Sequence, residues 1–508
     1  MGKLTIANLK KTIYYLQRNG IRNTWNAAWE RLSDKEKYQA EFLTRQQCEE
    51  LSEQALEQIK DLKDMGKEPP FFSVLVPAYQ TDPGFLRELL QSMKDQVYPL
   101  WELLVLDASK DGIVRKTLQE VCGELDLVLY NGTEGLNDAG YGVISEGVPG
   151  AGGGMLSDGM DGVRAAYESV VRYISLSKNE GISENTNAGF SFAKGNYLGL
   201  LDHDDVLTPD ALYEVAKAIW RPWEISGEKS PLVLYSDEDK WDGADQYYEL
   251  NRKEDFNLDL ILSNNYICHF MVLEESLFRE LKLRKEYDGA QDYDLVLRAA
   301  AKILERGGIP EEEICHIPRV LYHWRCHSAS TAENPRSKTY AYEAGRRALE
   351  DFAKGQGWDV TVKDLKHVGF YRMEYENLQE TLRQRTDLGA IGGKIVSGGV
   401  LTGGRMADDG SVYYEGLKEG YSGYLHRAVL TQDAEAVDLR CIAVQKEFWP
   451  LFEEVLGIPY VIKEETSCVF DPATLPKDAN IREMSVRFCT ALREQGKRIL
   501  WDPEWSVS

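Results

Sequence analysis

Three features that the sequence lacks each exclude a class of protein. None of its eight cysteines shows the CxxC spacing of zinc sites and redox dithiols, so we expect reduced thiols. No apolar run approaches the ~18 residues that a transmembrane helix needs. The N-terminus has neither the apolar core nor the cleavage site of a signal peptide. These absences lead us to expect a cytoplasmic protein.

Basic residues are also scarce, with 59 Lys and Arg against 83 Asp and Glu and a net charge of −24. Nucleic-acid phosphates need a basic surface, so this balance argues against nucleic-acid binding. An anionic substrate would instead need a local cation, either a metal or an arginine cluster. A length of 508 residues exceeds what one hydrophobic core usually organises and predicts two domains with appendages.

Residues 1–69 are predicted to form an N-terminal helical segment. Apolar residues recur at helical spacing up to Leu16, and Gly20 is a candidate stop. Residues 1–31 hold six basic residues and one acidic residue, Glu30, together with Trp25 and Trp29. Such a segment either docks on its own protein with its charges in solvent, or lies peripherally on the inner face of an anionic membrane.

From residue 71, apolar runs alternate with helical patterns. The runs cover residues 71–79, 101–109, 171–179, 196–205 and 232–240. Helices are expected between them, one of them beginning near Thr208 as its N-cap. This alternation predicts an α/β fold, with a mostly parallel sheet and helices on both faces. A Gly-rich insertion at 124–170 matches no phosphate-binding pattern and is either a surface loop or a lid over the site.

Polar residues end four of the predicted strands: Tyr79, Asp107, Asp202 to Asp205, and Asp237 to Asp239. Ligands bind beyond the carboxyl ends of such strands, so these side chains should meet at one rim. Three carboxylates packed together repel one another unless a cation offsets them, and Mn²⁺ or Mg²⁺ prefers oxygen ligands. We expect Asp204 to bind the metal and Asp202 to face the same side, whereas Asp205 could simply cap the next helix.

Six blocks occur in an order that resembles the family 2 glycosyltransferases of the GT-A fold, of the bacterial cell-surface polysaccharide type. The blocks are VPAY (76–79), LDASKD (106–111), NTNAG (185–189), AKGNYLGLLDHDD (193–205), YSDEDK (235–240) and YDGAQDYDLVLRA (287–299). A single DxD is weak evidence, but six ordered blocks are strong. The resemblance implies a catalytic domain at 70–350. It also implies inverting, metal-dependent transfer from a nucleotide-diphosphate sugar to a growing polysaccharide or a lipid-linked glycan.

The same resemblance implies roles for residues of the donor site. Pro77, Tyr79 and Asp107 would hold the nucleobase and ribose, and Asn187 and Asp202 would complete the nucleotide site. Many relatives carry two Asp residues where this chain has Leu106-Asp107, which leaves the base contact less defined than the metal contact. In the predicted strand 317–325, His323 would join Asp204 on the metal, or else serve a structural purpose, and Arg325 would meet the diphosphate.

The catalytic base of this family lies in a Glu-Asp or Gln-Asp pair that opens a helix, matched here by Gln291-Asp292. A carboxylate at a helix N-terminus is stabilised in its charged form, as a proton acceptor requires. Asp294 has either a role in the site or a helix-capping one. The acceptor or sugar pocket is expected to involve Gln291 and four further residues, Asp237, Asp239, His269 and Trp324.

Residues 351–508 resemble the back half of a second such domain without its nucleotide-binding front. Where a working copy would carry its acidic pair, this chain has Arg482-Glu483. We therefore expect a degenerate, non-catalytic module and one active site. Two other functions compete with the enzyme. A non-catalytic sugar- or nucleotide-binding protein would not need Asp204 and Asp292. A sugar nucleotidyltransferase should carry Arg and Lys in its first strand–loop, and residues 76–84 have neither.

Overall fold

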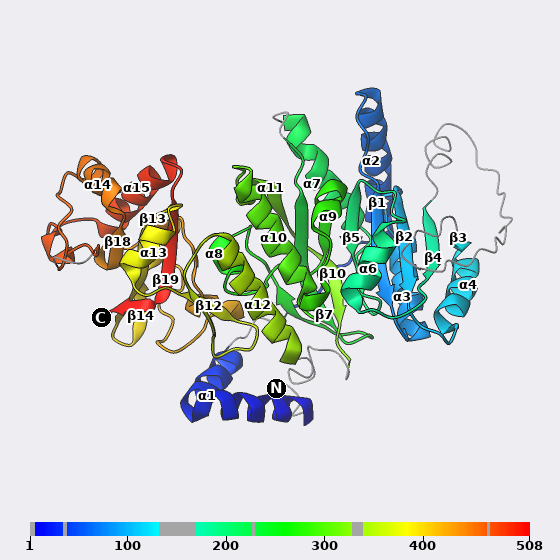
Figure 1. Cartoon of the computed structure of the whole chain (residues 1–508), viewed down its shortest axis with the longest axis horizontal. Coiled ribbons are helices and arrows are strands. Elements are labelled where there is room, and N and C mark those ends of the chain that lie inside the picture. The colour runs from blue at the N-terminus through cyan, green and yellow to red at the C-terminus, as the bar shows by residue number, and fades with distance from the viewer. Residues whose placement is uncertain (1–5, 34–37, 132–168, 226–228, 328–338, 465–467) are drawn as a thin grey trace. The chain divides into compact units, whose positions relative to one another are not determined.

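The computed structural model describes residues 6–33, 38–131, 169–225, 229–327, 339–464 and 468–508. The chain forms two compact units, each built from separate stretches of sequence (Figure 1). The sheet unit contains Lys37–Phe256 and Ile267–Ala344, and the C-terminal unit contains Met1–Glu36, Asn257–Tyr266 and Gly345–Ser508. The sequence analysis predicts three consecutive domains, 1–69, 70–350 and 351–508. The two compact units divide the chain differently, and the predicted boundaries stay a prediction.

The sheet unit is organised by one large sheet with strand order β3-β4-β2-β1-β5-β9-β7-β10-β6, and with β8 paired to β7. The neighbours from β3 to β5 run parallel, as do β7 and β10, whereas β9, β6 and β8 pair antiparallel. The strands are β1 (Phe72–Ala78), β2 (Trp101–Asp107), β3 (Val128–Asn131), β4 (Val170–Ser175), β5 (Tyr197–Leu200), β6 (Val206–Leu207), β7 (Val233–Trp241), β8 (Tyr247–Asn251), β9 (Met271–Glu274) and β10 (Ile314–Arg325).

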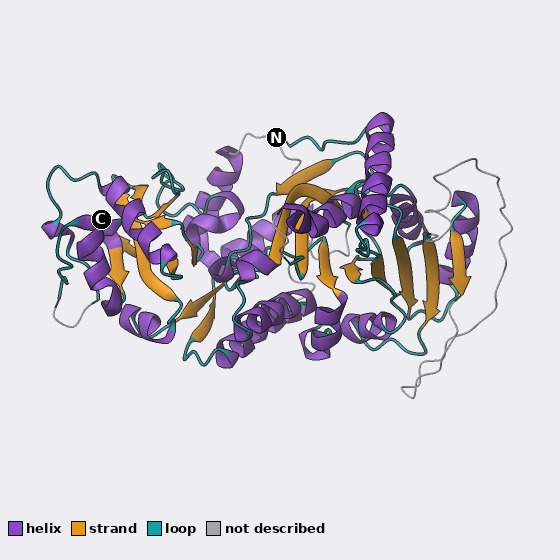
Figure 2. Cartoon of the chain, turned by 90° about the horizontal axis from the view of Figure 1, so that it is seen from above, coloured by secondary structure: helices purple, strands orange, loops and turns teal. Residues whose placement is uncertain are grey.

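Helices cover both faces of this sheet, as Figure 2 shows. The helices are α2 (Arg45–Asp64), α3 (Pro83–Lys94), α4 (Ile113–Leu125), α6 (Ile182–Phe190), α7 (Ala211–Ile225), α9 (Glu275–Leu281), α10 (Gln291–Glu305) and α11 (Pro310–Glu313), with a short 3-10 turn η1 (Lys285–Tyr287). Apolar side chains of α2, α3, α4 and α7 share one core with alternate residues of β1 and β2. On the other face α6 contacts β1 and β2, and α9 contacts β5 and β9.

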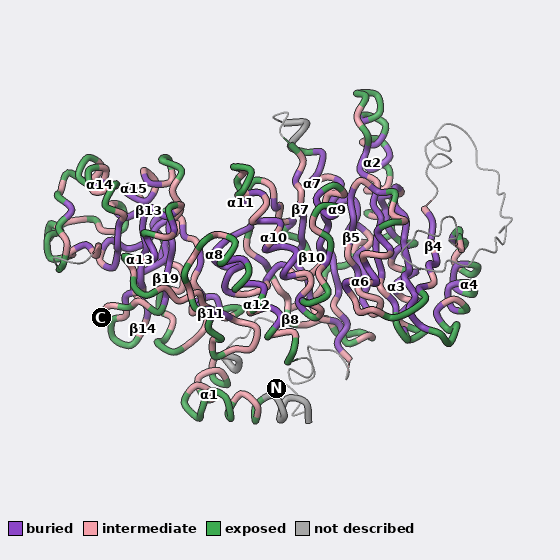
Figure 3. The backbone as a smooth tube through the Cα atoms, in the orientation of Figure 1, coloured by how far each residue is buried: buried purple, intermediate pink, exposed green. Residues whose placement is uncertain are grey.

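The predicted α/β fold, a mostly parallel sheet with helices on both faces (Figure 2), is therefore confirmed. Strand β2 is buried along its whole length and β1 along almost all of it, because both faces of the sheet are covered (Figure 3). Since β1, β2, β5, β7 and β10 run in one direction, their carboxyl ends lie along one edge of the sheet. The antiparallel β9 begins at the same edge.

One predicted helix boundary is wrong. Helix α7 begins at Ala211 rather than near Thr208, because β6 precedes it and the Thr208 hydroxyl donates to Asp210 at 2.7 Å. The predicted stop at Gly20 is confirmed, because α1 (Ile6–Ser33) consists of two helices that meet at this residue. The chain kinks there, at a φ of 74° that glycine tolerates, and resumes its helical path. Within the described residues, no helix combines the length and apolarity that crossing a membrane requires.

The C-terminal unit contains α1 and a smaller five-stranded sheet, so the predicted N-terminal helical segment and C-terminal α/β module are both present. Its helices are α8 (Leu258–Ile261), most of α12 (Thr339–Gly355), α13 (Leu378–Gln384), α14 (Trp449–Leu456) and α15 (Ile481–Glu494), with 3-10 turns η2 (Tyr424–Val429), η3 (Leu439–Cys441), η4 (Lys446–Phe448) and η5 (Pro472–Thr474). Its strands are β11 (Thr361–Asp364), β12 (Tyr371–Glu374), β13 (Leu388–Ser397), β14 (Val400–Gly403), β15 (Arg405–Met406), β16 (Gln432–Asp433), β17 (Ala436–Val437), β18 (Ile442–Val444) and β19 (Arg498–Val507).

This smaller sheet repeats the connectivity of one half of the larger one. Strand β13 pairs antiparallel with β14 and β18 and parallel with β19. Strand β7 pairs in the same way with β8, β9 and β10. Helices follow the third of these strands in both units: α9, α10 and the short α11 lie between β9 and β10, and α14 and α15 lie between β18 and β19. This is the connectivity that the predicted partial second copy would have.

Candidate functional site

The acidic cluster follows β5 directly, at the edge where the parallel strands end. The Asp202 side chain is 47% exposed, and its Oδ2 lies 4.0 Å from His269 Nε2. Asp204 is 22% exposed, with its Oδ2 2.9 Å from His327 Nε2. Both carboxylates are thus open to solvent and each faces an imidazole.

Asp205 differs from its neighbours because it is buried. Tyr322 donates its hydroxyl to Oδ2, and the Arg325 backbone N–H donates to Oδ1 at 2.7 Å. Burial, together with the nearby charges of Asp204 and Asp202, raises the pKa of Asp205 well above its ordinary value. The interpretation of Asp205 as a helix cap is therefore wrong, since its carboxylate holds β10 rather than α7.

The late histidine beside Asp204 is His327, not the predicted His323. His323 Nδ1 lies 2.6 Å from Asp239 Oδ1 and its ring is buried, so the structural alternative describes it. His327 lies just beyond the end of β10 and is partly exposed. A second grouping is formed by Asp202, Asp205 and His269, whose ligand atoms lie within 4.8 Å of one another.

His269 is held in place by Glu238, a residue that sequence reasoning did not select. Glu238 Oε2 lies 3.1 Å from His269 Nδ1 and also 3.1 Å from Lys253 Nζ. Burial alone would raise the pKa of Glu238, but Lys253 and His269 lower it to about 2. The imidazole stacks on Tyr322, with ring centroids 4.6 Å apart, so its orientation is fixed from two sides.

The two aspartates that flank Glu238 are engaged elsewhere. Asp237 Oδ1 lies 2.9 Å from His316 Nε2 and accepts the Lys253 backbone N–H at 2.8 Å. Asp239 is fully buried and accepts the Tyr38 hydroxyl at 2.7 Å in addition to its contact with His323. These contacts give both residues structural partners, and their expected place in an acceptor or sugar pocket stays a prediction.

Asp292, the predicted base, lies in the first turn of α10. Burial raises the pKa of the Cys268 thiol to about 11, and the charge of Asp292 also raises it. Cys268 Sγ is 3.6 Å from His269 Nε2. The residues just before β9 and just after β5 therefore meet, whereas the place of Asp292 in this site stays a prediction.

The residues beside Asp292 have mainly structural contacts. Gln291 Oε1 accepts the Gly289 backbone N–H at 2.8 Å. Asp294 is buried and forms ion pairs with Arg284 and Arg298. Of the two readings of Asp294, its burial and these ion pairs favour a structural one.

The predicted nucleotide residues lie at the ends of β1 and β2 and on α6. Tyr79 is 48% exposed and Pro77 is half-buried. Asp107 is buried. Its Oδ1 accepts the Ser109 N–H at 2.8 Å and its Oδ2 accepts the Tyr173 hydroxyl at 3.0 Å. The Asn187 carboxamide exchanges two hydrogen bonds with the Leu283 backbone. Only Tyr79 offers a largely open surface, and the nucleotide contacts of all four stay predictions.

Arg325 and Trp324 end β10 near the cluster. The Arg325 guanidinium is buried between the rings of Phe85 and Trp241, and its Nη2 is 2.5 Å from Glu88 Oε2. Its Nε also donates to the Asp204 backbone oxygen at 2.5 Å. These contacts fix the DxD turn, whereas the expected contact with a diphosphate stays a prediction. Trp324 is 5.5 Å from His269 between ring centroids and so borders the site.

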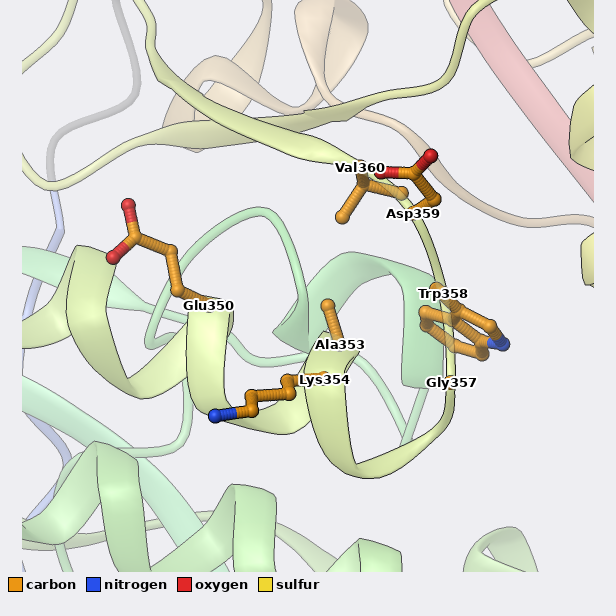
Figure 4. A pocket seen from close by; sticks show the side chains of 7 residues that line it. All are labelled: Glu350, Ala353, Lys354, Gly357, Trp358, Asp359 and Val360. Carbon is orange, nitrogen blue, oxygen red and sulfur yellow. The ribbon is translucent and has the colours of Figure 1, made fainter.

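A separate shallow pocket lies in the C-terminal unit, on the end of α12 and the turn after it (Figure 4). Glu350, Lys354, Trp358 and Asp359 contribute to its lining. It contains none of the predicted site residues. Of the predicted Gly-rich insertion at 124–170, residues 132–168 lie outside the described residues, whereas residues 128–131 form β3, so this part of the predicted insertion is wrong.

Comparison with known proteins identifies the family of one part of the chain. The model of "Glycosyl transferase family 2" matches residues 157–282, a span that includes the acidic cluster, Glu238 and His269. The chain carries a family 2 glycosyltransferase domain. It is 34% identical over 296 residues to the uncharacterized protein y4gI of Sinorhizobium fredii, covering 58% of this chain and 26% of that protein. It is 30% identical over 308 residues to the O-antigen biosynthesis protein RfbC of Myxococcus xanthus, covering 60% of this chain and 20% of that protein.

The chain thus spans about a quarter or less of the length of these two relatives. Among solved structures, TarS 1-349 of S. aureus in complex with UDP-GlcNAc is 16% identical, with a TM-score of 0.35, covering 56% of this chain and 66% of that one. The mannosyltransferase PcManGT of Pyrobaculum calidifontis, in complex with GDP-Man and Mn²⁺, is 14% identical, with a TM-score of 0.33, covering 61% and 86%.

Strand pairing lets the C-terminal unit be compared with the glycosyltransferase domain position by position. In the pairing with β9 or β18, Tyr235 and Gly392 are equivalent, which places Ile395 at the position of Glu238. The hairpin pairings Glu238 with Asn251 and Ile395 with Gly403 agree with this register. In the same comparison, Arg440 lies two residues before β18, and His269 lies two residues before β9, so Arg440 takes the position of His269. The two residues that orient the acidic site are therefore replaced in the smaller sheet.

Proposed function

We propose that the sheet unit is an inverting, metal-dependent glycosyltransferase. Its donor would be a nucleotide-diphosphate sugar and its acceptor a growing polysaccharide or a lipid-linked glycan. The family match and the O-antigen biosynthesis relative support this chemistry. The observation that carries the proposal is the grouping of carboxylates and imidazoles at the strand ends. Asp202 faces His269, which also contacts Cys268, and Asp204 faces His327.

We place the metal at Asp204 and His327. A carboxylate oxygen and an imidazole nitrogen are ligands that Mn²⁺ accepts, and Mg²⁺ is the alternative where oxygen ligands dominate. Both side chains are partly exposed, so coordination positions stay open for a diphosphate. In the second grouping Asp205 already uses both oxygens for Tyr322 and Arg325. When bound, the cation would offset the charge of the departing nucleoside diphosphate.

The chain's own residues would perform the proton transfer. Asp292 lies where the N-terminus of α10 stabilises a carboxylate. It would accept the acceptor's hydroxyl proton while the acceptor oxygen forms a bond to the anomeric carbon and the bond from that carbon to the diphosphate breaks. A single base acting without a protein nucleophile gives one displacement and hence inversion. Glu238 would keep His269 oriented at the edge of this site.

The test measures donor binding and nucleoside diphosphate release with a panel of nucleotide sugars and glycan acceptors, with and without Mn²⁺. Asp292→Asn should lower turnover by about 10²- to 10⁴-fold and leave donor affinity unchanged. Asp204→Ala and His327→Ala should each weaken Mn²⁺-dependent donor binding by about tenfold or more. Asp64→Asn, an exposed carboxylate on α2, is the control and should change neither quantity.

Each part of the proposal can fail separately. Unchanged turnover in Asp292→Asn would exclude this residue as the base. Donor binding that depends on Mn²⁺ but survives Asp204→Ala and His327→Ala, and is lost in Asp202→Ala, would move the metal to the second grouping. Donor binding with no release on any acceptor would favour a non-catalytic sugar- or nucleotide-binding protein.

A further inference from the structure

Helix α1 packs on the C-terminal unit through one of its faces. The Glu30 carboxylate accepts the backbone N–H groups of Ser422 and Gly423, at 3.0 and 2.6 Å. Asn23 Oδ1 accepts from Lys366 Nζ at 3.4 Å. The neighbouring Asn26 amide lies against Gly420. Residues 23, 26 and 30 recur at helical spacing, so they form one continuous docked face.

The opposite face of the same helical turns is apolar and exposed. Ile21 is 80% exposed, Trp25 is 63% exposed and Trp29 is 50% exposed. At about 100° per residue, these three side chains span an arc of about 80°, centred roughly opposite the docked residues. Docking therefore leaves this apolar face, formed by Ile21, Trp25 and Trp29, turned toward solvent. Large aromatic side chains at this exposure need an explanation.

Charge separates α1 from the rest of the protein. Residues 1–31 carry six basic residues and one acidic residue, in a chain of net charge −24. The single acid, Glu30, is occupied on the docked face. Arg22 is exposed and lies next to Ile21 on the edge of the apolar face. A positive helix with an apolar face suits a partner that is both anionic and apolar.

We propose that α1 is an interfacial helix that binds an anionic lipid surface through Ile21, Trp25 and Trp29. Indole rings sit well at the boundary of headgroups and acyl chains, where one part of the ring is apolar and the N–H is solvated. The basic residues would add attraction to acidic headgroups. A symmetric contact between two copies of α1 would instead bring two basic segments together. This inference does not depend on the proposed transfer reaction.

The test is co-sedimentation of the full chain with vesicles of phosphatidylcholine alone, or with one quarter phosphatidylglycerol. Binding should require the anionic lipid. It should weaken as the salt concentration rises from about 50 to about 500 mM, because the Debye length then falls from about 14 to about 4 Å. Trp25→Ala/Trp29→Ala should lower the partition coefficient by about tenfold or more, because each buried aromatic side chain contributes strongly to transfer from water. Ile21→Ala should also lower it. Ile309→Ala, at a 50% exposed isoleucine of the sheet unit, is its matched control and should have no effect.

Circular dichroism and the oligomeric state in solution are measured on the same variants. The substituted side chains are exposed, so thermal stability should stay unchanged. Sedimentation that does not require anionic lipid, or that survives the double substitution, would overturn the proposal. A dimer that becomes a monomer in Trp25→Ala/Trp29→Ala, without vesicle binding by the unmodified chain, would assign the face to a second copy and also overturn it.

Discussion

Glu238 offers a direct test of how the acidic site is held. Its carboxylate is buried between Lys253 Nζ, His269 Nδ1 and Asn251 Nδ2, each within 3.1 Å. Glu238→Gln keeps the size and removes the charge. Lys253, whose side chain is fully buried, then loses its ion-pair partner, and His269 loses the acceptor that orients it. We expect the variant to be less stable and to bind donor less well.

The magnitude follows from the pKa of Glu238. It falls from an ordinary 4.5 to about 2 in the folded protein. At about 1.4 kcal/mol per pKa unit, the charged carboxylate contributes about 3 kcal/mol at pH 7. Breaking a buried ion pair by removing one partner costs about 3–5 kcal/mol in other proteins, which agrees.

The sign of the pH dependence is fixed by the direction of this pKa change. A carboxylate with a depressed folded pKa stabilises the protein above the unfolded value of 4.5, and this contribution is lost as the pH falls toward 2. The difference between the unmodified protein and Glu238→Gln should therefore shrink to about 2 kcal/mol at pH 3.5.

Urea unfolding followed by circular dichroism at pH 7 and pH 3.5 measures both values. Asp237→Asn is the matched control, since Asp237 is adjacent in β7 but contacts His316 rather than His269. It should leave Mn²⁺-dependent donor affinity unchanged, whereas Glu238→Gln should lower it. A cost below about 1 kcal/mol at pH 7, or a cost independent of pH, would refute the reasoning.

Two further substitutions test neighbouring assignments. Arg385→Met should destabilise the C-terminal unit by about 3–5 kcal/mol in a urea titration, because the buried Asp259 carboxylate loses its two hydrogen bonds of 2.8 Å to Arg385. Asp387, the other carboxylate that pairs with Arg385, is half-buried, so Asp387→Asn should cost less than about 1 kcal/mol in the same titration. Burial alone would raise the pKa of Asp259, but Arg385 lowers it, so the Arg385→Met difference should diminish below pH 3.8. His323→Ala should lower the melting temperature through loss of the contact with Asp239, yet leave Mn²⁺ affinity measured by calorimetry unchanged; a loss of Mn²⁺ affinity would restore His323 as the ligand.

The sequence predicts the sheet well because its information is local. Apolar runs such as residues 101–109 are buried on both faces of β2, and polar residues appear where each strand leaves the core. Parallel strands bring these ends to one edge, which is why Asp202 and Asp204 could be placed near Asp107 without any knowledge of contacts.

The partners of each site residue were harder to predict, because they come from distant elements. The alternation of side chains along β7 places Glu238 on one face of the strand and Asp237 and Asp239 on the other. It does not show which of the two faces contacts Lys253 and His269, because these residues follow β8 in the chain. His327 was missed since it follows the last residue of β10, where the expected strand stopped. Two features of the sequence could have indicated His327: it is a polar residue just after the end of a predicted strand, and it lies four residues after His323.

The smaller sheet shows which residues of the larger one serve its fold and which serve its site. Both sheets share the same connectivity and the same apolar burial, yet Ile395 replaces Glu238, and Arg440 replaces His269. Exchanging a buried ion pair for an apolar side chain is often neutral or stabilising, so this half-sheet does not need the carboxylate to fold. Burying the charged groups of Glu238, Lys253 and Asp205 in the sheet unit costs free energy. Their presence is then better explained by the chemistry at the strand ends than by a contribution to stability. On this argument we expect one active site in the chain, and Ile395→Glu alone should give the smaller sheet no metal affinity, because Arg440 in place of His269 offers no ligand atom for a metal.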